Sequence, residues 1–198
     1  MPFSVPVALP QAWLFEALAL LFFALVLVAA RRRQREAGGS RDSRSRWGII
    51  IQGLSFPITA LGPVHAGLRW LDPAAIGSYA AVLLLMGGAL ALFARSSAAL
   101  GKNWSIVART REDHELVRTG PYAHVRHPIY LAILLVLLAM AVAIGHWLQL
   151  VVALPLFFVG TKMRTDAEEK LLEQSFGETF RDYRSSTPSI IPKIGRVA

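Results

Sequence analysis

The sequence has no cysteine and, for a chain of 198 residues, few charged side chains. Without cysteine it can form no disulfide, no thiolate metal site and no cysteine nucleophile. Only 17% of its residues are charged and 54% are hydrophobic, whereas a typical soluble domain has about 25% and about 45–50%. The composition therefore excludes an ordinary soluble domain, and the high apolar content excludes an intrinsically disordered chain.

What the sequence does contain is long apolar runs. Five of them lie at residues 12–30, 47–67, 74–94, 128–145 and 147–161. A helix needs about 20 apolar residues to cross a bilayer, with a range of about 17–25, so the first three runs are long enough. The last two are shorter, and only Gly145 and His146 separate them, which predicts a helical hairpin in the membrane. The fold class that we expect is an all-α integral membrane protein with about five transmembrane helices.

The basic residues are distributed unevenly between these runs. Segments 31–46, 95–127 and 162–198 hold twenty of the 21 lysines and arginines, and Arg69 is the exception. Five spans place the three segments on one side, which the positive-inside rule assigns to the cytoplasm, with the N-terminus outside. The net charge of +8 therefore indicates membrane topology and attraction to anionic lipids. Nucleic-acid binding is not expected, because the charges are spread over three loops without a binding motif.

Two polar clusters fall on the predicted cytoplasmic side. The first lies where the fourth span begins and contains Tyr122, Arg126, His127 and Tyr130. Pro128 favours a helix start there, and the unpaired N–H groups of a helix start suit an anion. The second cluster follows the fifth span and includes Arg164 and Glu168, four residues apart on one helix face. Because the hairpin returns to the side from which it starts, we predict that the two clusters meet.

Both clusters also have simpler interpretations. Arg126 and His127 could face lipid phosphates, and Arg164 with Glu168 could form an ordinary surface salt bridge of little energetic consequence. Beyond the second cluster, Leu172, Phe176 and Phe180 recur at every fourth position. That spacing predicts an amphipathic cytoplasmic C-terminal helix.

Three stretches carry a pattern of higher specificity: LGKNWS at 100–105, HELVRTGPYAHVRHPIY at 114–130 and RTDAEEKLLEQSFGETFRDYRSSTPSIIP at 164–192. In this order, with an apolar hairpin between the last two, they resemble the isoprenylcysteine carboxyl methyltransferase family and its phospholipid methyltransferase relatives. The resemblance covers about residues 95–192. It implies an integral membrane methyltransferase that uses S-adenosyl-methionine in a cytoplasm-facing pocket closed by the C-terminal helix.

The resemblance also implies a division of the chain and a set of roles. Residues 1–94 would form three transmembrane helices with an Arg-rich cytoplasmic linker at 31–46. Residues 95–198 would form the methyltransferase core, with a cofactor loop, the hairpin 128–161 and a cap helix. Arg164 would lie near the substrate and the reacting methyl group, as the catalytic and substrate-binding residue. The cofactor-binding residues would be His114, Glu115, Leu116, Val117, Tyr122, His127, Pro128, Ile129, Tyr130 and Glu168.

The expected partners are membrane lipids and a lipophilic acceptor, with the carboxylate of an isoprenylcysteine-like compound most similar to the family. Methylation of a phospholipid amine or of a thiol stays open, and the sequence sets no oligomeric state. Two other classes also stay open: an NADPH-dependent membrane reductase of the sterol-reductase type, and a non-catalytic membrane scaffold. The short chain without cysteine suits a prokaryotic plasma-membrane protein, for which a prenylated protein substrate is not assured.

Overall fold

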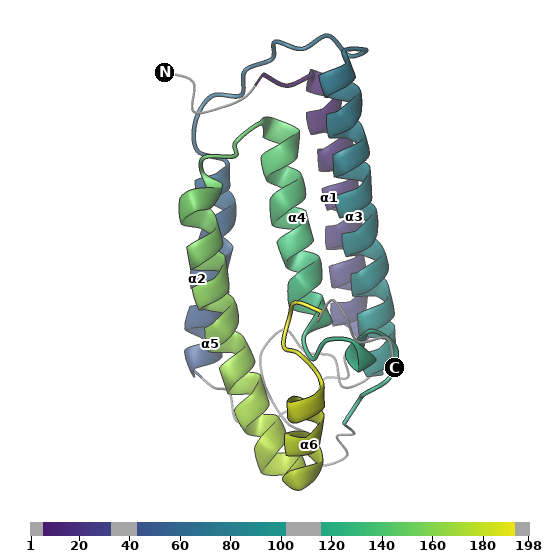
Figure 1. Cartoon of the computed structure of the whole chain (residues 1–198), viewed down its shortest axis with the longest axis vertical. Coiled ribbons are helices and arrows are strands. Elements are labelled where there is room, and N and C mark those ends of the chain that lie inside the picture. Colours follow the sequence, from purple (N-terminus) through teal and green to yellow (C-terminus); the bar gives the residue numbers. More distant parts are fainter. Residues whose placement is uncertain (1–5, 33–42, 102–115, 193–198) are drawn as a thin grey trace.

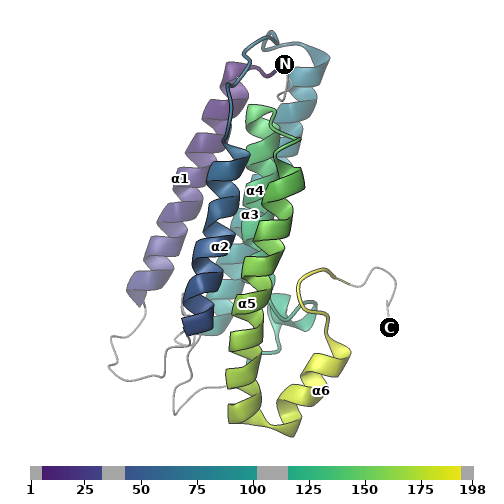
Figure 2. The same ribbon diagram turned by 90° about the vertical axis from the view of Figure 1, so that its left-hand side faces the viewer.

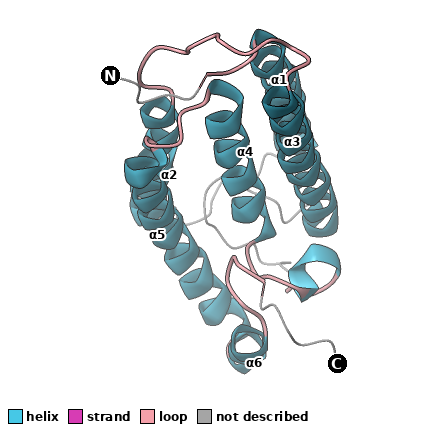
Figure 3. Ribbon diagram, turned by 45° about the horizontal axis from the view of Figure 1, so that its top comes forward, coloured by secondary structure: helices cyan, strands magenta, loops and turns pink. Residues whose placement is uncertain are grey.

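The computed structural model describes residues 6–32, 43–101 and 116–192, and every regular element within them is a helix (Figure 3). The α-helices are α1 (Leu9–Arg32), α2 (Ser43–Thr59), α3 (Pro73–Leu100), α4 (Pro128–Ile144), α5 (Leu150–Phe176) and α6 (Glu178–Ser186). A short 3-10 helix, η2 (Gly120–Ala123), precedes α4. The expected all-α fold is confirmed.

The helices α1 to α5 run alternately up and down in one elongated bundle, with α6 at its lower end (Figures 1 and 2). α2 packs along α5, whereas α3 packs along α4 and α1 covers both α3 and α4. α4 is therefore the central helix, and its alanines Ala132, Ala139, Ala141 and Ala143 are fully buried. Small side chains at these positions allow neighbouring helices to approach closely.

The outer surface of the bundle is apolar. Leu20 and Phe23 of α1 are 65% and 60% exposed, and Leu84 of α3 is 77% exposed. Among the described residues, two helical segments, Leu9–Arg31 and Pro73–Leu100, are long and apolar enough to cross a membrane, and Pro128–Ile144 is a shorter apolar helix. Contiguous exposed apolar surface of this kind is unfavourable in water and favourable against lipid. The chain therefore has the character of a membrane protein.

The helix boundaries differ from the sequence prediction at two places. The second apolar run is helical only to Thr59. Gly62 then adopts a positive φ of 111° and Pro63 follows it; a positive φ does not fit a right-handed helix, and a proline disfavours helical conformation in the residue before it. The predicted C-terminal amphipathic helix is divided at Gly177, whose φ is 50°. As a result α5 extends without a break to Phe176 and carries the second polar cluster.

The end of the bundle opposite α6 is closed by polar side chains that bind backbone carbonyl groups. Gln11 Nε2 donates to the carbonyl oxygens of Val142 and Ala143, both at 3.0 Å. His146 lies fully buried with its Nδ1 2.9 Å from the carbonyl oxygen of Thr59. These contacts satisfy carbonyl groups that the C-terminal turns of α4 and α2 leave without helical partners.

Candidate active site

The first polar cluster is built at the start of α4. Pro128 occupies the first turn of the helix and keeps the preceding residue out of helical conformation, so His127 is the N-cap. The backbone N–H groups of Arg126 and His127 donate to the carbonyl oxygens of Pro188 and Ser189, both at 2.9 Å. The segment that follows α6 thus binds the N-cap N–H group and the one before it, just ahead of the helix start that the sequence indicated for an anion. We call residues 187–189 the C-terminal strap.

Arg126 turns inward and connects three segments. Its Nε and Nη2 lie 3.0 Å and 2.9 Å from Glu169 Oε1, and its Nη1 donates to the carbonyl oxygens of Arg184, at 3.0 Å, and Thr187. The side chains of Arg126 and Glu169 are only 11% and 15% exposed. A charge buried to this degree is stable only when it is paired. Arg126 therefore does not face lipid phosphates, as one interpretation of the sequence had it.

His127 lies between two carboxylates of α5. Its Nε2 is 2.8 Å from Glu169 Oε1 and its Nδ1 is 3.4 Å from Glu168 Oε2. Burial alone would lower the pKa of His127, but the hydrogen bonds and charges of the two glutamates outweigh it and raise that pKa above 6.5. Burial alone would raise the pKa of each glutamate, but His127, helped by Arg164 at Glu168 and by Arg126 at Glu169, lowers both below 4.5. The three groups therefore stabilise one another in their charged forms.

Tyr130 and Arg164 complete the cluster. The hydroxyl of Tyr130 donates to Glu168 Oε1, and Arg164 Cζ lies 4.7 Å from the centre of the Tyr130 ring, which is within the range of a cation–π interaction. Arg164 Nη1 donates to Gln52 Oε1 at 2.6 Å. Residues from the start of α4 and from α5 thus lie in one network, and the prediction that the two polar clusters meet is confirmed.

The helix α6 is fastened to the same site through two tyrosines. The hydroxyl of Tyr183 donates to the carbonyl oxygen of Tyr122 at 2.6 Å, and Phe180, fully buried, packs on the Tyr183 ring. Burial raises the pKa of Tyr122 well above 10.0 and that of Tyr183 to about 12. Both phenols are therefore neutral at physiological pH, and Tyr183 can act as a hydrogen-bond donor.

Four more of the predicted cofactor residues lie in the part of the chain that the structure describes. Pro128 is buried, and Ile129 packs against the core formed around Phe93. Leu116 and Val117 are half-buried in the segment that leads into η2. Two predicted residues lie outside the part of the chain that the structure describes: His114 and Glu115.

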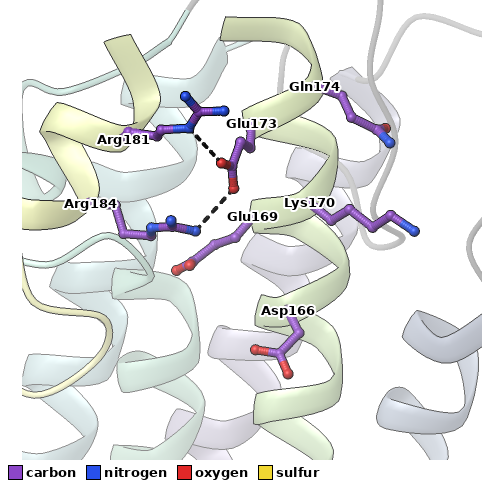
Figure 4. A pocket seen from close by; sticks show the side chains of 7 residues that line it. All are labelled: Asp166, Glu169, Lys170, Glu173, Gln174, Arg181 and Arg184. Atoms are coloured by element: carbon purple, nitrogen blue, oxygen red, sulfur yellow. Dashed lines mark hydrogen bonds and ion pairs between the residues drawn. The ribbon is translucent and has the colours of Figure 1, made fainter. Parts of the chain in front are cut away.

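A polar cleft of about 460 Å³ opens between α5 and α6, next to the network (Figure 4). Its lining residues are Asp166, Glu169, Lys170, Glu173, Gln174, Arg181 and Arg184. Glu173 binds Arg181 Nε at 2.8 Å and Arg184 Nη1 at 3.1 Å, which holds α6 against α5. Glu169 belongs both to the cleft wall and to the network, so the network borders a space that a polar ligand can enter.

Two members of the network were not assigned a role from the sequence. Glu169 belongs to the second polar cluster, but only its contacts with Arg126 and His127 show that it is a partner of the first cluster. Gln52 is the one strongly polar side chain within the apolar stretch 47–54. Polar side chains inside transmembrane helices commonly form hydrogen bonds between helices, so this isolated glutamine was a signal that could have been used.

Known proteins with similar sequences cover the part of the chain that carries this network. The sequence model of the isoprenylcysteine carboxyl methyltransferase family matches residues 80–174, from α3 to the end of α5. Protein-S-isoprenylcysteine O-methyltransferase of Schizosaccharomyces pombe is 31% identical over 109 residues, which are 53% of this chain and 46% of that protein.

Two bacterial proteins match over a longer range. The cobalt-zinc-cadmium resistance protein CzcN of Cupriavidus metallidurans is 32% identical over 156 residues, which are 77% of this chain and 66% of that protein. The nickel-cobalt-cadmium resistance protein NccN of Alcaligenes xylosoxydans xylosoxydans is 30% identical over 154 residues, which are 77% of this chain and 67% of that protein. The matches thus span between about half and two thirds of the length of these relatives.

The matched range contains the start of α4, the apolar hairpin and the Arg164–Glu168 face of α5, in the order that the sequence motifs required. The chain belongs to the isoprenylcysteine carboxyl methyltransferase family.

Proposed function

We propose that this protein is an integral membrane methyltransferase that transfers a methyl group from S-adenosyl-methionine to a lipophilic acceptor. The observation that carries the proposal is the single network of His127, Tyr130, Arg164 and Glu168. It lies within the range that matches the family and borders a polar cleft. Charged groups of both signs, held in fixed positions, suit a reaction in which positioning supplies most of the acceleration.

For the membrane, we propose five crossings by α1 to α5, with the network on the cytoplasmic side. Exposed tryptophans support this placement, because tryptophan is enriched where the bilayer meets water. Trp13 near the start of α1, Trp70 between α2 and α3, and Trp147 between α4 and α5 are 65%, 66% and 50% exposed. These segments lie at the end opposite α6 (Figure 1), whereas Trp47, 61% exposed, is near the start of α2 at the other end. At about 1.5 Å per residue, the 17 residues of α2 or of α4 reach the lower limit for a span.

The carboxylate of Glu168 fits the amino group of the cofactor that the family implies. S-adenosyl-methionine supplies an electrophilic methyl group on a sulfonium, and its amino group is a cation. The side chain of Glu168 is 26% exposed, and its lowered pKa keeps it charged. A carboxylate has about four lone-pair sites, of which Tyr130 and His127 engage two. Glu168 can therefore bind the ammonium group, while His127 and Tyr130 hold the Glu168 side chain in place.

For the acceptor, we propose a lipophilic carboxylate. The name of the yeast relative describes O-methylation of an isoprenylcysteine. A carboxylate is already a nucleophile and needs no base, whereas an amine would require one. Arg164, beside Tyr130 and Gln52, can orient a carboxylate by a charge-assisted hydrogen bond. The apolar helix surfaces around the site would admit the lipophilic part of the acceptor from the membrane.

Binding of S-adenosyl-homocysteine to the purified protein in lipid nanodiscs, measured by calorimetry beside NADPH, tests the proposal. We expect S-adenosyl-homocysteine to bind and NADPH not to bind. Glu168→Gln should weaken S-adenosyl-homocysteine by about 10- to 100-fold, the effect of losing a hydrogen bond to a charged group. Glu178→Gln, at a side chain that is 79% exposed, is the control and should bind like the wild type.

Three other binding results would each contradict part of this proposal. Binding of NADPH alone would assign the protein to the reductase class. If neither compound bound, the site would be non-catalytic and the scaffold interpretation would take its place. Equal affinities of the Glu168→Gln and Glu178→Gln variants would remove Glu168 from the cofactor site.

A further inference from the structure

We infer that Gln52 of α2 is a positioning residue that holds the Arg164 guanidinium in place for methyl transfer. The inference rests on the proposed function, because it assigns Arg164 to the acceptor. Gln52 lies outside residues 80–174, the range that matches the family. Gln52 therefore connects α2, which the family match does not cover, to Arg164 in the network.

The geometry around Gln52 is specific. Its side chain is buried, with 3% of the residue exposed. Its Oε1 accepts a hydrogen bond from Arg164 Nη1 at 2.6 Å, and its Nε2 donates to Thr161 Oγ1 at 2.8 Å. The chemistry fixes the orientation of the amide, since a guanidinium can only donate and a threonine hydroxyl can accept. The amide therefore bridges Thr161 and Arg164, two residues three positions apart on α5.

Two glycines bring the amide within reach of α5. A Cβ added to Gly160 would lie 2.4 Å from the backbone nitrogen of Gln52 and 2.7 Å from the carbonyl oxygen of Gly48. A Cβ added to Gly48 would lie 2.7 Å from the carbonyl oxygen of Gly160 and 2.6 Å from Cγ of Arg164. Only glycine at both positions allows α2 and α5 to cross so closely. The crossing sets the distance between Gln52 and Arg164.

Arg164 is thus held from two directions. The Tyr130 ring of α4 lies 4.7 Å from its Cζ, and Gln52 of α2 fixes one of its nitrogens. A free arginine side chain has many rotamers. The Arg164 guanidinium can orient a carboxylate with two of its N–H groups only when it is held in one of these rotamers. Without Gln52, Arg164 would keep its charge and its contact with Tyr130 but would lose the hydrogen bond that holds its Nη1. The turnover number should then fall while cofactor affinity stays unchanged.

The test compares Gln52→Leu, which removes both hydrogen bonds at similar volume, with Gln52→Glu, which keeps an acceptor for Arg164. The acceptor probe is N-acetyl-S-farnesylcysteine, and kcat, KM and S-adenosyl-homocysteine affinity are measured in nanodiscs. The second readout is the NMR signal of the Arg164 guanidinium, assigned by its loss in Arg164→Lys. A fixed guanidinium gives separate Nη signals, and a freely rotating one gives a single averaged signal. Gln11→Leu, which also removes a buried glutamine that binds across helices, is the matched control.

We expect Gln52→Leu to lower kcat by about 10- to 100-fold, the effect of a misplaced reacting group. It should also average the Nη signals and leave S-adenosyl-homocysteine affinity unchanged. Gln52→Glu should restore separate signals and most of the turnover, and Gln11→Leu should match the wild type. Wild-type kcat or separate Nη signals in Gln52→Leu would overturn the inference.

Failure of the proposed function gives a different pattern. If the wild type neither binds S-adenosyl-homocysteine nor methylates the probe, the role of Gln52 in methyl transfer falls together with that function. If the wild type binds S-adenosyl-homocysteine but Gln52→Leu behaves like Gln11→Leu, only the positioning role is overturned.

Discussion

The two ends of the bundle bury polar side chains in different ways. At the end opposite α6, Gln11 and His146 bind backbone carbonyl groups of neighbouring helices. At the α6 end, Arg126 and His127 both bind Glu169, which carries the opposite charge. The first arrangement completes the hydrogen bonding of helix ends. The second concentrates charges that a ligand can use.

Burial of a polar group does not by itself indicate a functional site. Both Gln11 and His127 are almost fully buried, yet only His127 has ionised side chains as partners. Buried charges are costly unless they are paired, so each charge of this cluster depends on its partners. Polar side chains bind backbone carbonyl groups at one end and charged side chains at the other. Substitutions at the two ends should therefore differ in their effects on stability and on activity.

The largest effect is expected from Arg126→Ala at the α6 end. The substitution leaves Glu169 largely buried with one cationic partner fewer, and it removes the donor to the strap carbonyl of Thr187. We expect a loss of about 3 kcal/mol, the lower end of the range for a broken buried ion pair, since His127 remains. Denaturant unfolding in detergent micelles measures the loss. Arg181→Ala, at a side chain that is 51% exposed, should cost much less, because exposed ion pairs contribute little to stability. An equal cost for both variants would contradict this difference between buried and exposed pairs.

Arg164→Ala should affect turnover more than stability. Removing a positioned donor to the reacting group lowers kcat by about 100-fold, and cofactor affinity should stay within about twofold of the wild type. Kinetics with N-acetyl-S-farnesylcysteine and calorimetry with S-adenosyl-homocysteine measure the two quantities. Lys162→Ala serves as the control, because Lys162 is 74% exposed and pairs with Asp166. Normal turnover in Arg164→Ala would reduce Arg164 to a structural residue.

At the opposite end, Gln11→Leu should reverse this pattern. The variant loses two hydrogen bonds to α4, but the buried Oε1 of Gln11 has no hydrogen-bond partner among the residues that the structure describes. Removal of this unpaired oxygen offsets part of the loss. We expect a destabilisation of about 1 kcal/mol with unchanged kcat in the folded protein. Unfolding and activity assays on the same preparation check both parts. A drop in kcat with normal stability would show that this end takes part in function.

The smallest effect concerns pH. The raised pKa of His127 means that its stabilisation is complete below pH 6.5 and is lost as pH rises through the raised value. The lowered pKa values of Glu168 and Glu169 mean that their stabilisation is complete above pH 4.5 and is lost as pH falls. The α6 end should therefore be most stable between pH 4.5 and 6.5.

Hydrogen exchange of α6 amides across this pH range, corrected for intrinsic rates, tests the pH effect. Protection of α6 should decline above pH 6.5, the ordinary pKa of histidine. The decline should be absent in His127→Gln. A decline that persists in this variant would assign the effect to another group.

The sequence predicted what depends on local chemistry and on chain direction. Pro128 defined the start of α4, and the return of the hairpin brought Arg164 and Glu168 to His127. The contact of α2 with Arg164 was not predicted, because Gln52 could indicate which side of α2 packs inward but not which helix that side faces. The close approach at Gly48 and Gly160 sets the rotation of α2 against α5, and with it the contact of Gln52.

The C-terminal strap has a consequence for biosynthesis. The backbone N–H groups of Arg126 and His127 bind the carbonyl oxygens of Pro188 and Ser189, which the ribosome adds after all of α1 to α6. The helices α1 to α5 are therefore synthesised while the start of α4 still lacks these two partners. The strap contacts of the site form only after α6 has been made, and a nascent chain that stops after α5 would lack them.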